Sequence, residues 1–570
     1  MVGEANGHQF GQGKKCHYLV QEKCTIYNDR PETCRKYFCA WSQGIFPEWM
    51  KPNQCGVMVS VEGQYPNQYL KVVELSPTID PAVYKEVQDF CDRQNTHYVR
   101  VPYMNNNPQQ VQPSALETFT ILFDRLKRRD LSLEMLHVLY NNSNSFIQYQ
   151  EIAKCYYNLN DYDGIVKATT KAIELVPDEA SKASLRENII STFNKFNEPE
   201  LALKAIEENE KFGITCDLLM SKQFALFLLN RKDEAEKVLY QALSLPNLTE
   251  QQLTSLKFNT GSYHFRNDRF REGLQAFIVE GGKLNFWKTN NSQFFKDKGS
   301  FSGIQEWKGE YVEGGTVILH AEAGIGDEIV NIRFSKHIKD MGMTPLWYSD
   351  SAGREDLKKI FSRSGFTLID NLKEVKGIKN LRWIHSMHLP LVLGCEYKDL
   401  WYGPYIKPDP EYVKKWEEMT RTHKKLKIGI RWQGAPHYEQ DLHRTIPLGD
   451  IYNAIGHLDA AFYSLQKDDG VDDTSQFPGL YDLSKDLECW DDTLGVMHNM
   501  DFIITSCTSI PHMALASGVK TYVLPPIATY YTWSNKQDVN PWYGENATVL
   551  PQEVNKSWKE PLDKLKNLLK

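Results

Sequence analysis

No apolar run in the sequence approaches the roughly 20 residues that a membrane-spanning helix needs, so we expect no membrane span. Positive charge is not in excess either, because the 570 residues carry a formal net charge of −7 at pH 7. Nucleic acid is therefore not expected as a general partner, since phosphate binding needs clustered cations. The net charge does not exclude a local basic groove. The first 15 residues are polar and glycine-rich and lack the hydrophobic segment of a secretory signal.

An even set of cysteines is also lacking. The count is eleven, and six of these lie within the first 91 residues. Secreted disulfide frameworks usually use even counts in short chains. We therefore expect a cytoplasmic protein whose cysteines are reduced and in part bind metal.

Changes of composition and period divide the chain into four segments. A chain of 570 residues exceeds a single hydrophobic core, so three or four domains are expected. We predict a cysteine-rich α+β module (1–113) that ends in an Asn-, Gln- and Pro-rich linker (105–113), helical repeats (114–290) and two α/β lobes (300–410 and 411–570). The expected fold class is multidomain α/β with an α-solenoid.

The first segment has a short regular pattern. Alternating apolar residues predict a strand at residues 68–76. A helix is expected at 80–93, with Asp80 as its N-cap and Pro81 at its first position. A returning strand is expected at 96–103.

The second segment is repetitive. Residues 146–177 place small and aromatic side chains as in a 34-residue helix–turn–helix unit. Steps of 37, 33 and 38 residues lead from Ile165 to Ala202, Ala235 and Gly273. The pattern resembles a tetratricopeptide array of about four units, which implies a solenoid whose concave surface recruits a protein partner or an acceptor.

From Gly314 onward, short apolar runs alternate with amphipathic helices, the rhythm of a doubly wound α/β layer. The predicted elements are strands at 316–320, 345–348, 367–369, 427–432, 461–466, 502–506 and 521–524, with helices at 327–341 and 355–364. Two such lobes would bind ligands beyond the carboxyl ends of their strands.

A glycine turn follows the first strand of this region. Gly324 and Gly326 let the backbone turn directly into a helix and approach a ligand closely. Asp327 stands at the helix start, where the helix dipole favours an ionised carboxylate. Such a group could deprotonate a hydroxyl, or it could simply cap the helix.

A hydroxyl-rich turn follows the strand at 502–506. Thr508 and Ser509, with the free amides of a helix that starts near Pro511, would suit a diphosphate. His512, in the first helical turn, could add a hydrogen-bond donor. The alternative is an ordinary N-cap with a polar first turn.

Two arginines and one glutamine are further candidates for the same cleft. Arg431 and Arg444 could pair with phosphate oxygens through their planar guanidinium groups, although exposed arginines near turns are common. Gln466 ends the next strand and would point into the same cleft.

Together these motifs resemble a known family. Residues 320–334, His-Ala-Glu-Ala-Gly-Ile-Gly-Asp-Glu-Ile-Val-Asn-Ile-Arg-Phe, are similar to the start of the transferase lobe of tetratricopeptide-containing bacterial glycosyltransferases. Those are similar to lipopolysaccharide heptosyltransferases and, more distantly, to protein O-linked N-acetylglucosamine transferases. The resemblance covers about residues 150–552 and implies a two-lobed GT-B fold, a nucleotide-sugar donor held mainly by the C-terminal lobe, and no obligatory metal.

The resemblance also implies roles for individual residues. Asp327 matches the acidic residue that serves as general base in heptosyltransferases. Thr508 and His512 match the Thr and His of an Asp-Thr-x-x-x-His donor signature, and Arg444 matches the basic residue expected near donor phosphate. Cys507 stands where the family usually has Asp, which bears on which donor is accepted and on whether the lobe is active.

The N-terminal thiols form a separate group. Cys16, Cys24, Cys34 and Cys39 lie within 24 residues, a spacing that suits Zn²⁺ or an iron–sulfur centre. The sequence of residues 16–39 resembles the YkgJ-like family of zinc- or iron-chelating cysteine clusters. The alternative is a set of buried, reduced cysteines without metal.

The sequence therefore predicts a metal-independent, inverting glycosyltransferase of hexosyl or heptosyl type. Asp327 would deprotonate an acceptor hydroxyl, and residues 508–512 with Arg444 would stabilise the departing diphosphate. One rival hypothesis is a scaffold whose repeats bind a partner while the α/β lobes are inert. Another makes the cysteine module the active part, in redox or metal-dependent chemistry.

Overall fold

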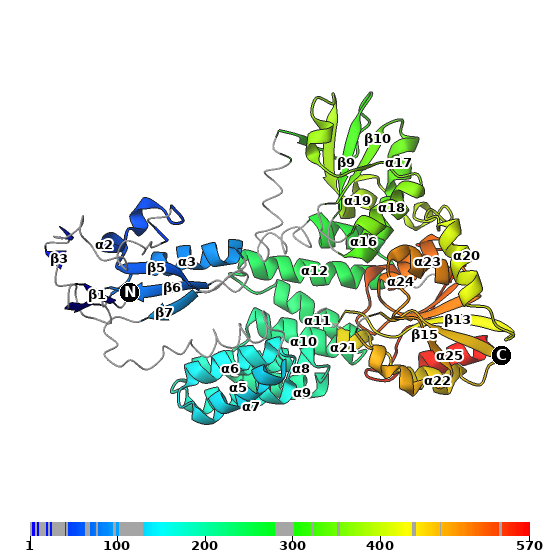
Figure 1. Cartoon of the computed structure of the whole chain (residues 1–570). Coiled ribbons are helices and arrows are strands. Elements are labelled where there is room, and N and C mark those ends of the chain that lie inside the picture. Colours follow the sequence, from blue (N-terminus) through cyan, green and yellow to red (C-terminus); the bar gives the residue numbers. More distant parts are fainter. Residues whose placement is uncertain are drawn as a thin grey trace. The chain divides into compact units, whose positions relative to one another are not determined.

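The computed structural model divides into two compact units, Met1–Ala172 and Ile173–Lys570 (Figure 1). The residues it describes are 3–5, 8–10, 19–20, 23–24, 40–41, 44–62, 69–75, 78–94, 98–101, 129–279, 301, 303–321, 324–349, 354–435, 441–467, 469–534 and 538–570. None of the helices in these ranges combines the length and the apolar character needed to cross a membrane. The predicted boundaries near 113 and 290 fall outside the described ranges and stay predictions.

The first unit contains a three-stranded sheet. Strand β5 (Val57–Glu62) pairs antiparallel with β6 (Tyr69–Glu74), and β6 pairs parallel with β7 (Tyr98–Val101). Helix α3 (Pro81–Gln94) makes the crossover, and Asp80 caps it by accepting a hydrogen bond from the Ala82 amide at 2.9 Å. The predicted strand, helix and returning strand are thus confirmed, whereas β5 was not predicted.

Shorter elements precede this sheet. They are the hairpins β1 (Gly3–Ala5) with β2 (His8–Phe10) and β3 (Leu19–Val20) with β4 (Lys23–Cys24), and the helices η1 (Glu48–Met50) and α2 (Pro52–Cys55).

Consecutive helices are paired from residue 146 onward. The pairs are α6 (Phe146–Asn158) with α7 (Tyr162–Leu175), α8 (Glu179–Lys195) with α9 (Pro199–Asn209), α10 (Cys216–Leu228) with α11 (Lys232–Leu243), and α12 (Glu250–Arg266) with α13 (Phe270–Leu274). Helix α5 (Arg129–Asn142) precedes them, and η3 (Glu210–Phe212) and η4 (Gln275–Val279) extend α9 and α13.

The turns inside these pairs repeat in register. Each contains a left-handed residue five positions before the small or apolar residue predicted from the repeat. These residues are Asn160, Asn197, Asn230 and Asp268, with φ of 53°, 61°, 59° and 54°. Asn and Asp tolerate this conformation better than most residues, so the paired helices follow from the predicted spacing.

The next part of the chain forms a parallel five-stranded sheet in the order β11-β10-β9-β12-β8. Its strands are β8 (Gln305–Glu306), β9 (Thr316–His320), β10 (Thr344–Tyr348), β11 (Leu368–Ile369) and β12 (Leu381–His385). Its helices are α16 (Ile325–Asn331), η6 (Ile332–Phe334), α17 (Ser335–Asp340), α18 (Glu355–Arg363), η7 (Leu372–Val375), η8 (Ser386–His388), α19 (Leu389–Val392) and η9 (Tyr397–Asp399).

The C-terminal part forms a parallel six-stranded sheet in the order β15-β14-β13-β16-β17-β18. Its strands are β13 (Leu426–Arg431), β14 (Ala460–Ser464), β15 (Leu480–Asp482), β16 (Phe502–Ser506), β17 (Thr521–Leu524) and β18 (Ala547–Val549). Its helices are α20 (Pro410–Met419), α21 (Asp441–Arg444), α22 (Leu448–Ile455), η10 (Val471–Gln476), α23 (Trp490–Met497), α24 (Ser509–Ala516), η11 (Tyr531–Trp533) and α25 (Lys559–Leu568).

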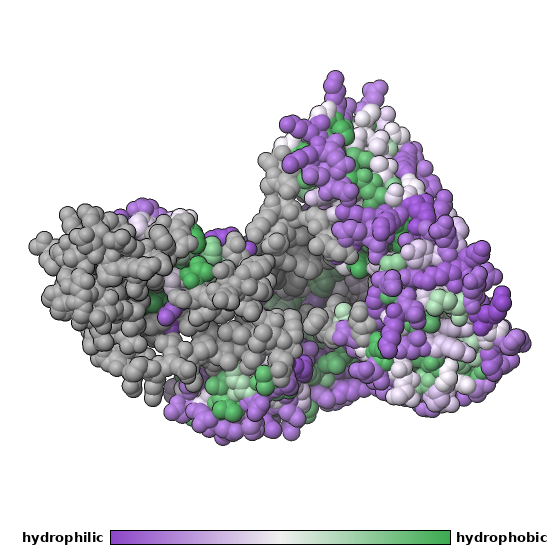
Figure 2. All heavy atoms as spheres, in the orientation of Figure 1, coloured by the Kyte–Doolittle hydropathy of each residue, from purple (hydrophilic) through white to green (hydrophobic). Residues whose placement is uncertain are grey.

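Both sheets are α/β layers with parallel strands, as the alternating pattern predicts. One difference concerns the helix expected at 327–341: α16 begins at Ile325, and the short turn η6 separates it from α17. The early start follows from Asp327, whose carboxylate accepts a hydrogen bond from the Gly324 amide at 2.9 Å and so caps the first turn. Among the residues coloured in Figure 2, hydrophilic ones predominate and hydrophobic ones form small scattered patches.

Candidate functional site

Two helix starts, one from each parallel sheet, meet in the structure. Helix α16 follows β9 and helix α24 follows β16, and the two helices pack against each other. Gly326 permits this approach, since a Cβ atom there would lie 3.0 Å from Cδ2 of His512 and 3.7 Å from the Cα of Ser509. The structure thus brings together the two motifs that the sequence singles out, although they lie almost 190 residues apart.

The Asp327 carboxylate is half-buried at this junction. Its Oδ2 accepts the hydrogen bond from the Gly324 amide, and its Oδ1 accepts one from the hydroxyl of Tyr530. Tyr530 belongs to the segment that follows β17, so this bond joins the two lobes. Because each carboxylate oxygen can accept two hydrogen bonds, this arrangement orients the carboxylate and is compatible with a further donor.

His512 is buried and held by aromatic side chains. Its Nδ1 lies 2.7 Å from the Tyr543 hydroxyl, and its ring stacks on Trp533 with centroids 4.8 Å apart. Burial lowers the pKa of His512 to about 3, so the ring is neutral at physiological pH. Burial also raises the pKa of Tyr543 well above its usual value, so both groups are neutral, and the tautomer of His512 decides which of them donates.

Arg333 connects the two lobes next to Tyr543. Its guanidinium donates to the backbone oxygens of Val330, Leu400 and Trp542 at 2.8, 2.9 and 2.5 Å and to the Tyr405 hydroxyl at 2.8 Å. The side chain is fully buried, and the Tyr543 ring centroid lies 4.7 Å from its Cζ. Arg333 therefore ties helix η6 of one lobe to the Trp542–Tyr543 segment of the other.

Arg444 lies next to the start of α24. Its Nη1 donates to the Cys507 carbonyl at 3.0 Å, and its Nε pairs with Asp441 at 2.8 Å. Thr508 caps α24 by accepting a hydrogen bond from the Ile510 amide at 3.2 Å. Arg444 thus contacts the backbone of residue 507, so cysteine in place of aspartate does not remove this contact.

Gly434 makes room for that guanidinium. A Cβ atom at this position would lie 2.0 Å from Nη2 of Arg444, so no larger residue fits without displacing it. The Cys507 thiol is protonated, because burial raises its pKa. This corner of the site therefore holds the Arg444–Asp441 ion pair and a neutral thiol.

Arg431 and Gln466 both form hydrogen bonds with the backbone. Arg431 donates to the Leu465 carbonyl at 2.9 Å. The fully buried Gln466 donates to the Asp469 carbonyl at 2.6 Å, and its Oε1 accepts from the Gln433 amide at 3.2 Å. These two residues shape the loops at the carboxyl ends of β13 and β14.

The predicted thiol cluster lies outside the described residues. Nothing is described of Cys16, Cys34 and Cys39, and only the backbone of Cys24 is described, within β4. Across the ranges that the structure describes, no group of three or more His, Cys, Asp or Glu side chains could hold a metal ion. The cysteine site stays a prediction.

Several polar and aromatic residues at the carboxyl edges of the two sheets were not predicted from the sequence. Tyr530 and Trp533 were not predicted, although the chain between 527 and 543 is rich in aromatic residues, which is a readable signal. A buried pair was also missed: Nδ1 of His320 lies 3.2 Å from Nδ1 of His385, at the carboxyl ends of adjacent strands. The Tyr348 ring stacks on His320.

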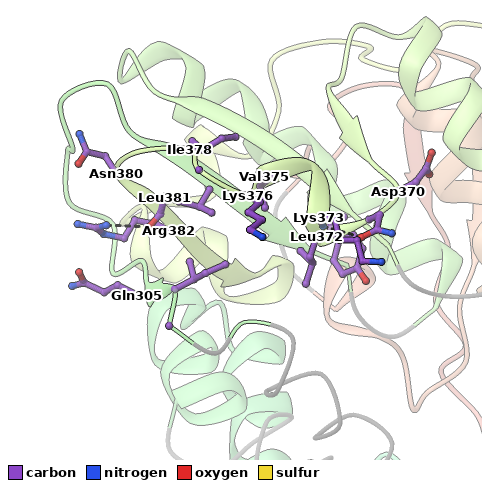
Figure 3. Close-up of a pocket in the computed structure, with 15 residues that line it drawn as sticks. Gln305, Asp370, Leu372, Lys373, Val375, Lys376, Ile378, Asn380, Leu381 and Arg382 are labelled. Carbon is purple, nitrogen blue, oxygen red and sulfur yellow. Dashed lines mark hydrogen bonds between the residues drawn. The ribbon is translucent and has the colours of Figure 1, made fainter.

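A concavity of about 950 Å³ lies elsewhere, on the five-stranded sheet (Figure 3). Its lining includes Tyr348, Gln305 and three cationic side chains, Lys373, Lys376 and Arg382. Asp327, Thr508 and His512 are not part of it. The residues predicted to act on the sugar and this concavity are therefore separate features of the molecule.

No protein-family model and no curated protein matches the chain. Among solved structures it is similar to ADP-heptose lps heptosyltransferase II of E. coli, at 10% identity and a TM-score of 0.29 over 45% of this chain and 97% of that one. It is similar to a glycosyl transferase family 9 protein of Veillonella parvula, with 12% identity and a TM-score of 0.30 over 43% of this chain and 88% of that one. It is also similar to an O-GlcNAc transferase of Thermobaculum terrenum, with 11% identity and a TM-score of 0.28 over 77% of this chain and 90% of that one.

Acid should destabilise the fold through two buried histidines. Burial lowers the pKa of His512 to about 3 and that of His443 to about 4, both below the ordinary value of 6.5. The unfolded chain therefore binds more protons, so this stability is complete above pH 6.5 and is lost as pH falls. Each histidine can contribute a slope of up to about 1.4 kcal/mol per pH unit.

Urea unfolding between pH 5 and 6.5, above the usual carboxylate range, measures this slope. His443→Gln should reduce it, because one of the buried histidines with a lowered pKa is removed. An equal free energy of unfolding at pH 5 and pH 6.5 would contradict the assignment of both histidines as neutral.

Proposed function

We propose that the chain is an inverting glycosyltransferase that moves a sugar from a nucleotide-sugar donor to an acceptor hydroxyl, without an obligatory metal. The observation that carries the proposal is the packing of α16 against α24, with Gly326 in contact with His512 and Ser509. This contact brings a carboxylate from one sheet beside the helix start of the other, and the carboxyl ends of parallel strands are where α/β sheets bind ligands.

Asp327 is the proposed general base. The acceptor hydroxyl donates its proton to the carboxylate while its oxygen attacks the anomeric carbon, and the bond from that carbon to the diphosphate oxygen breaks. Attack from the face opposite the leaving group inverts the anomeric configuration. The Gly324 amide and the Tyr530 hydroxyl hold the carboxylate in one orientation, which supports this role.

The negative charge that develops on the departing diphosphate would be stabilised at the start of α24. The donors there are the amides of the first helical turn, the hydroxyls of Thr508 and Ser509, and, when Tyr543 donates to Nδ1, the Nε2–H of His512. Arg444, which donates to the carbonyl of Cys507 and pairs with Asp441, adds a guanidinium beside this helix start. A site with these donors can bind diphosphate without a metal.

The remaining parts of the proposal concern partners. The helix pairs would recruit the acceptor or a protein partner, and the cysteine-rich segment would bind Zn²⁺ or an iron–sulfur centre as a separate module. The rival is a scaffold with inert α/β lobes, which the replacement of the family Asp by Cys507 favours.

A thermal-shift screen against nucleotide sugars and free nucleotides tests the donor site. A nucleotide at a hundred times its Kd should stabilise the protein by about 2.7 kcal/mol. Arg444→Met should abolish the shift, whereas Arg382→Met, which removes a cation on the other sheet, should leave it unchanged. No shift with any nucleotide would overturn the donor site and favour the scaffold.

A further inference from the structure

The segment between β17 and η11 lies against the paired helices as well as against Asp327. Ile527 is buried in the same hydrophobic cluster as Leu226, Phe227 and Leu239 of helices α10 and α11. Tyr530, three residues later, donates a hydrogen bond from its hydroxyl to the Asp327 carboxylate. A chain of three residues therefore links the helix pairs to the proposed general base.

Aromatic packing extends this link to helix α12. The Tyr531 ring centroid lies 5.2 Å from that of Phe265, at the end of α12, and 5.9 Å from that of Phe277. Tyr531 also contacts the Tyr530 ring, with centroids 4.4 Å apart. Movement of the end of α12 would thus displace the two tyrosines together.

Arg266 makes the polar part of the same junction. Its Nη2 donates to the Thr529 carbonyl at 3.5 Å, and its guanidinium lies over the Phe227 ring at 3.6 Å. Within the described ranges no carboxylate forms an ion pair with Arg266, and burial lowers its pKa to about 9. A buried guanidinium is a costly way to join two surfaces that an apolar side chain could join, but only a donor can hold the Thr529 carbonyl.

We propose that Arg266 is a positioning residue for the general base: from helix α12 it holds the backbone at Thr529, which sets the Tyr530 hydroxyl against the Asp327 carboxylate. The helix pairs are then part of the catalytic site and not only a recruitment surface. The catalytic meaning of this inference rests on the proposed function, whereas the mechanical link from Arg266 to Asp327 does not.

Hydrogen exchange measured by mass spectrometry tests the mechanical link in the full chain without any substrate. Arg266→Met should speed exchange about tenfold in peptides covering 527–533 and also in those covering 324–331, and Arg266→Lys should have a smaller effect. The control Arg231→Met removes an exposed arginine paired with Glu234 and should leave both peptides unchanged. Two outcomes would overturn the proposal: faster exchange at 527–533 with an unchanged rate at 324–331, or unchanged rates in both peptides.

Kinetics test the catalytic meaning, with turnover of a donor as the readout. Tyr530→Phe removes the far end of the link without touching α12, so it is informative even if Arg266→Met unfolds. Both variants should lower kcat by about tenfold and leave KM for the donor unchanged, because the carboxylate loses its orientation while the donor site is untouched. The double variant should be no worse than Tyr530→Phe, and additive losses would contradict the proposal. Absence of turnover in the wild type would remove the proposed function and leave the exchange result to stand alone.

Discussion

Asp327→Asn is expected to lower kcat by about 10²- to 10⁴-fold, the usual contribution of a general base. The amide cannot take up the proton of the acceptor hydroxyl, so the nucleophile stays neutral. The asparagine Oδ1 can still accept one of the two hydrogen bonds that Gly324 and Tyr530 provide, so we expect the fold and the affinity for the donor to be retained.

The matched control is Asp340→Asn on helix α17, an exposed carboxylate paired with Lys336. It should leave kcat within about twofold of the wild type, because exposed ion pairs contribute little. Unaltered turnover in Asp327→Asn would remove Asp327 from the base role, and a lowered Tm in that variant would instead point to a structural cap.

Arg333→Met is expected to lower the free energy of unfolding by about 3–5 kcal/mol. The side chain is fully buried, and its removal leaves the carbonyls of Leu400 and Trp542 in a dry interior without this donor. Methionine restores part of the volume but none of the hydrogen bonds. Because the bond to Trp542 joins the two lobes, we also expect the unfolding transitions of the lobes to separate.

Urea denaturation followed by tryptophan fluorescence measures both effects. Arg231→Met serves as the control, since its partly exposed pair with Glu234 should contribute less than about 1 kcal/mol. A midpoint for Arg333→Met equal to that of the control would show that Arg333 does not hold the lobes together.

Local periodicity predicted much of the α/β region. Strands β16 (Phe502–Ser506) and β17 (Thr521–Leu524) agree with the expected 502–506 and 521–524, because both are fully buried and read as continuous apolar runs. Strand β12 was missed because its sequence, Leu-Arg-Trp-Ile-His, mixes charged and apolar residues and has no clear alternation.

Some residues of the candidate site were likewise predicted from the sequence, and others were not. Gly326, Asp327, Ser509 and His512 were predicted from local motifs, and the structure brings them together. Tyr530 was not predicted, because its contact with Asp327 spans 203 residues and depends on how two sheets pack. Arg431 and Gln466 both donate to backbone carbonyls, which residue type alone does not reveal, and their role in ligand binding stays a prediction.

The measurement that most directly tests the account is donor turnover followed by NMR. The protein would be incubated with each nucleotide sugar that binds, with water as acceptor, and the anomeric proton of the released sugar would be recorded before it mutarotates. The account predicts release of a nucleoside diphosphate and a sugar of inverted configuration, both lost in Asp327→Asn. Retained configuration, or equal release by wild type and Asp327→Asn, would contradict it.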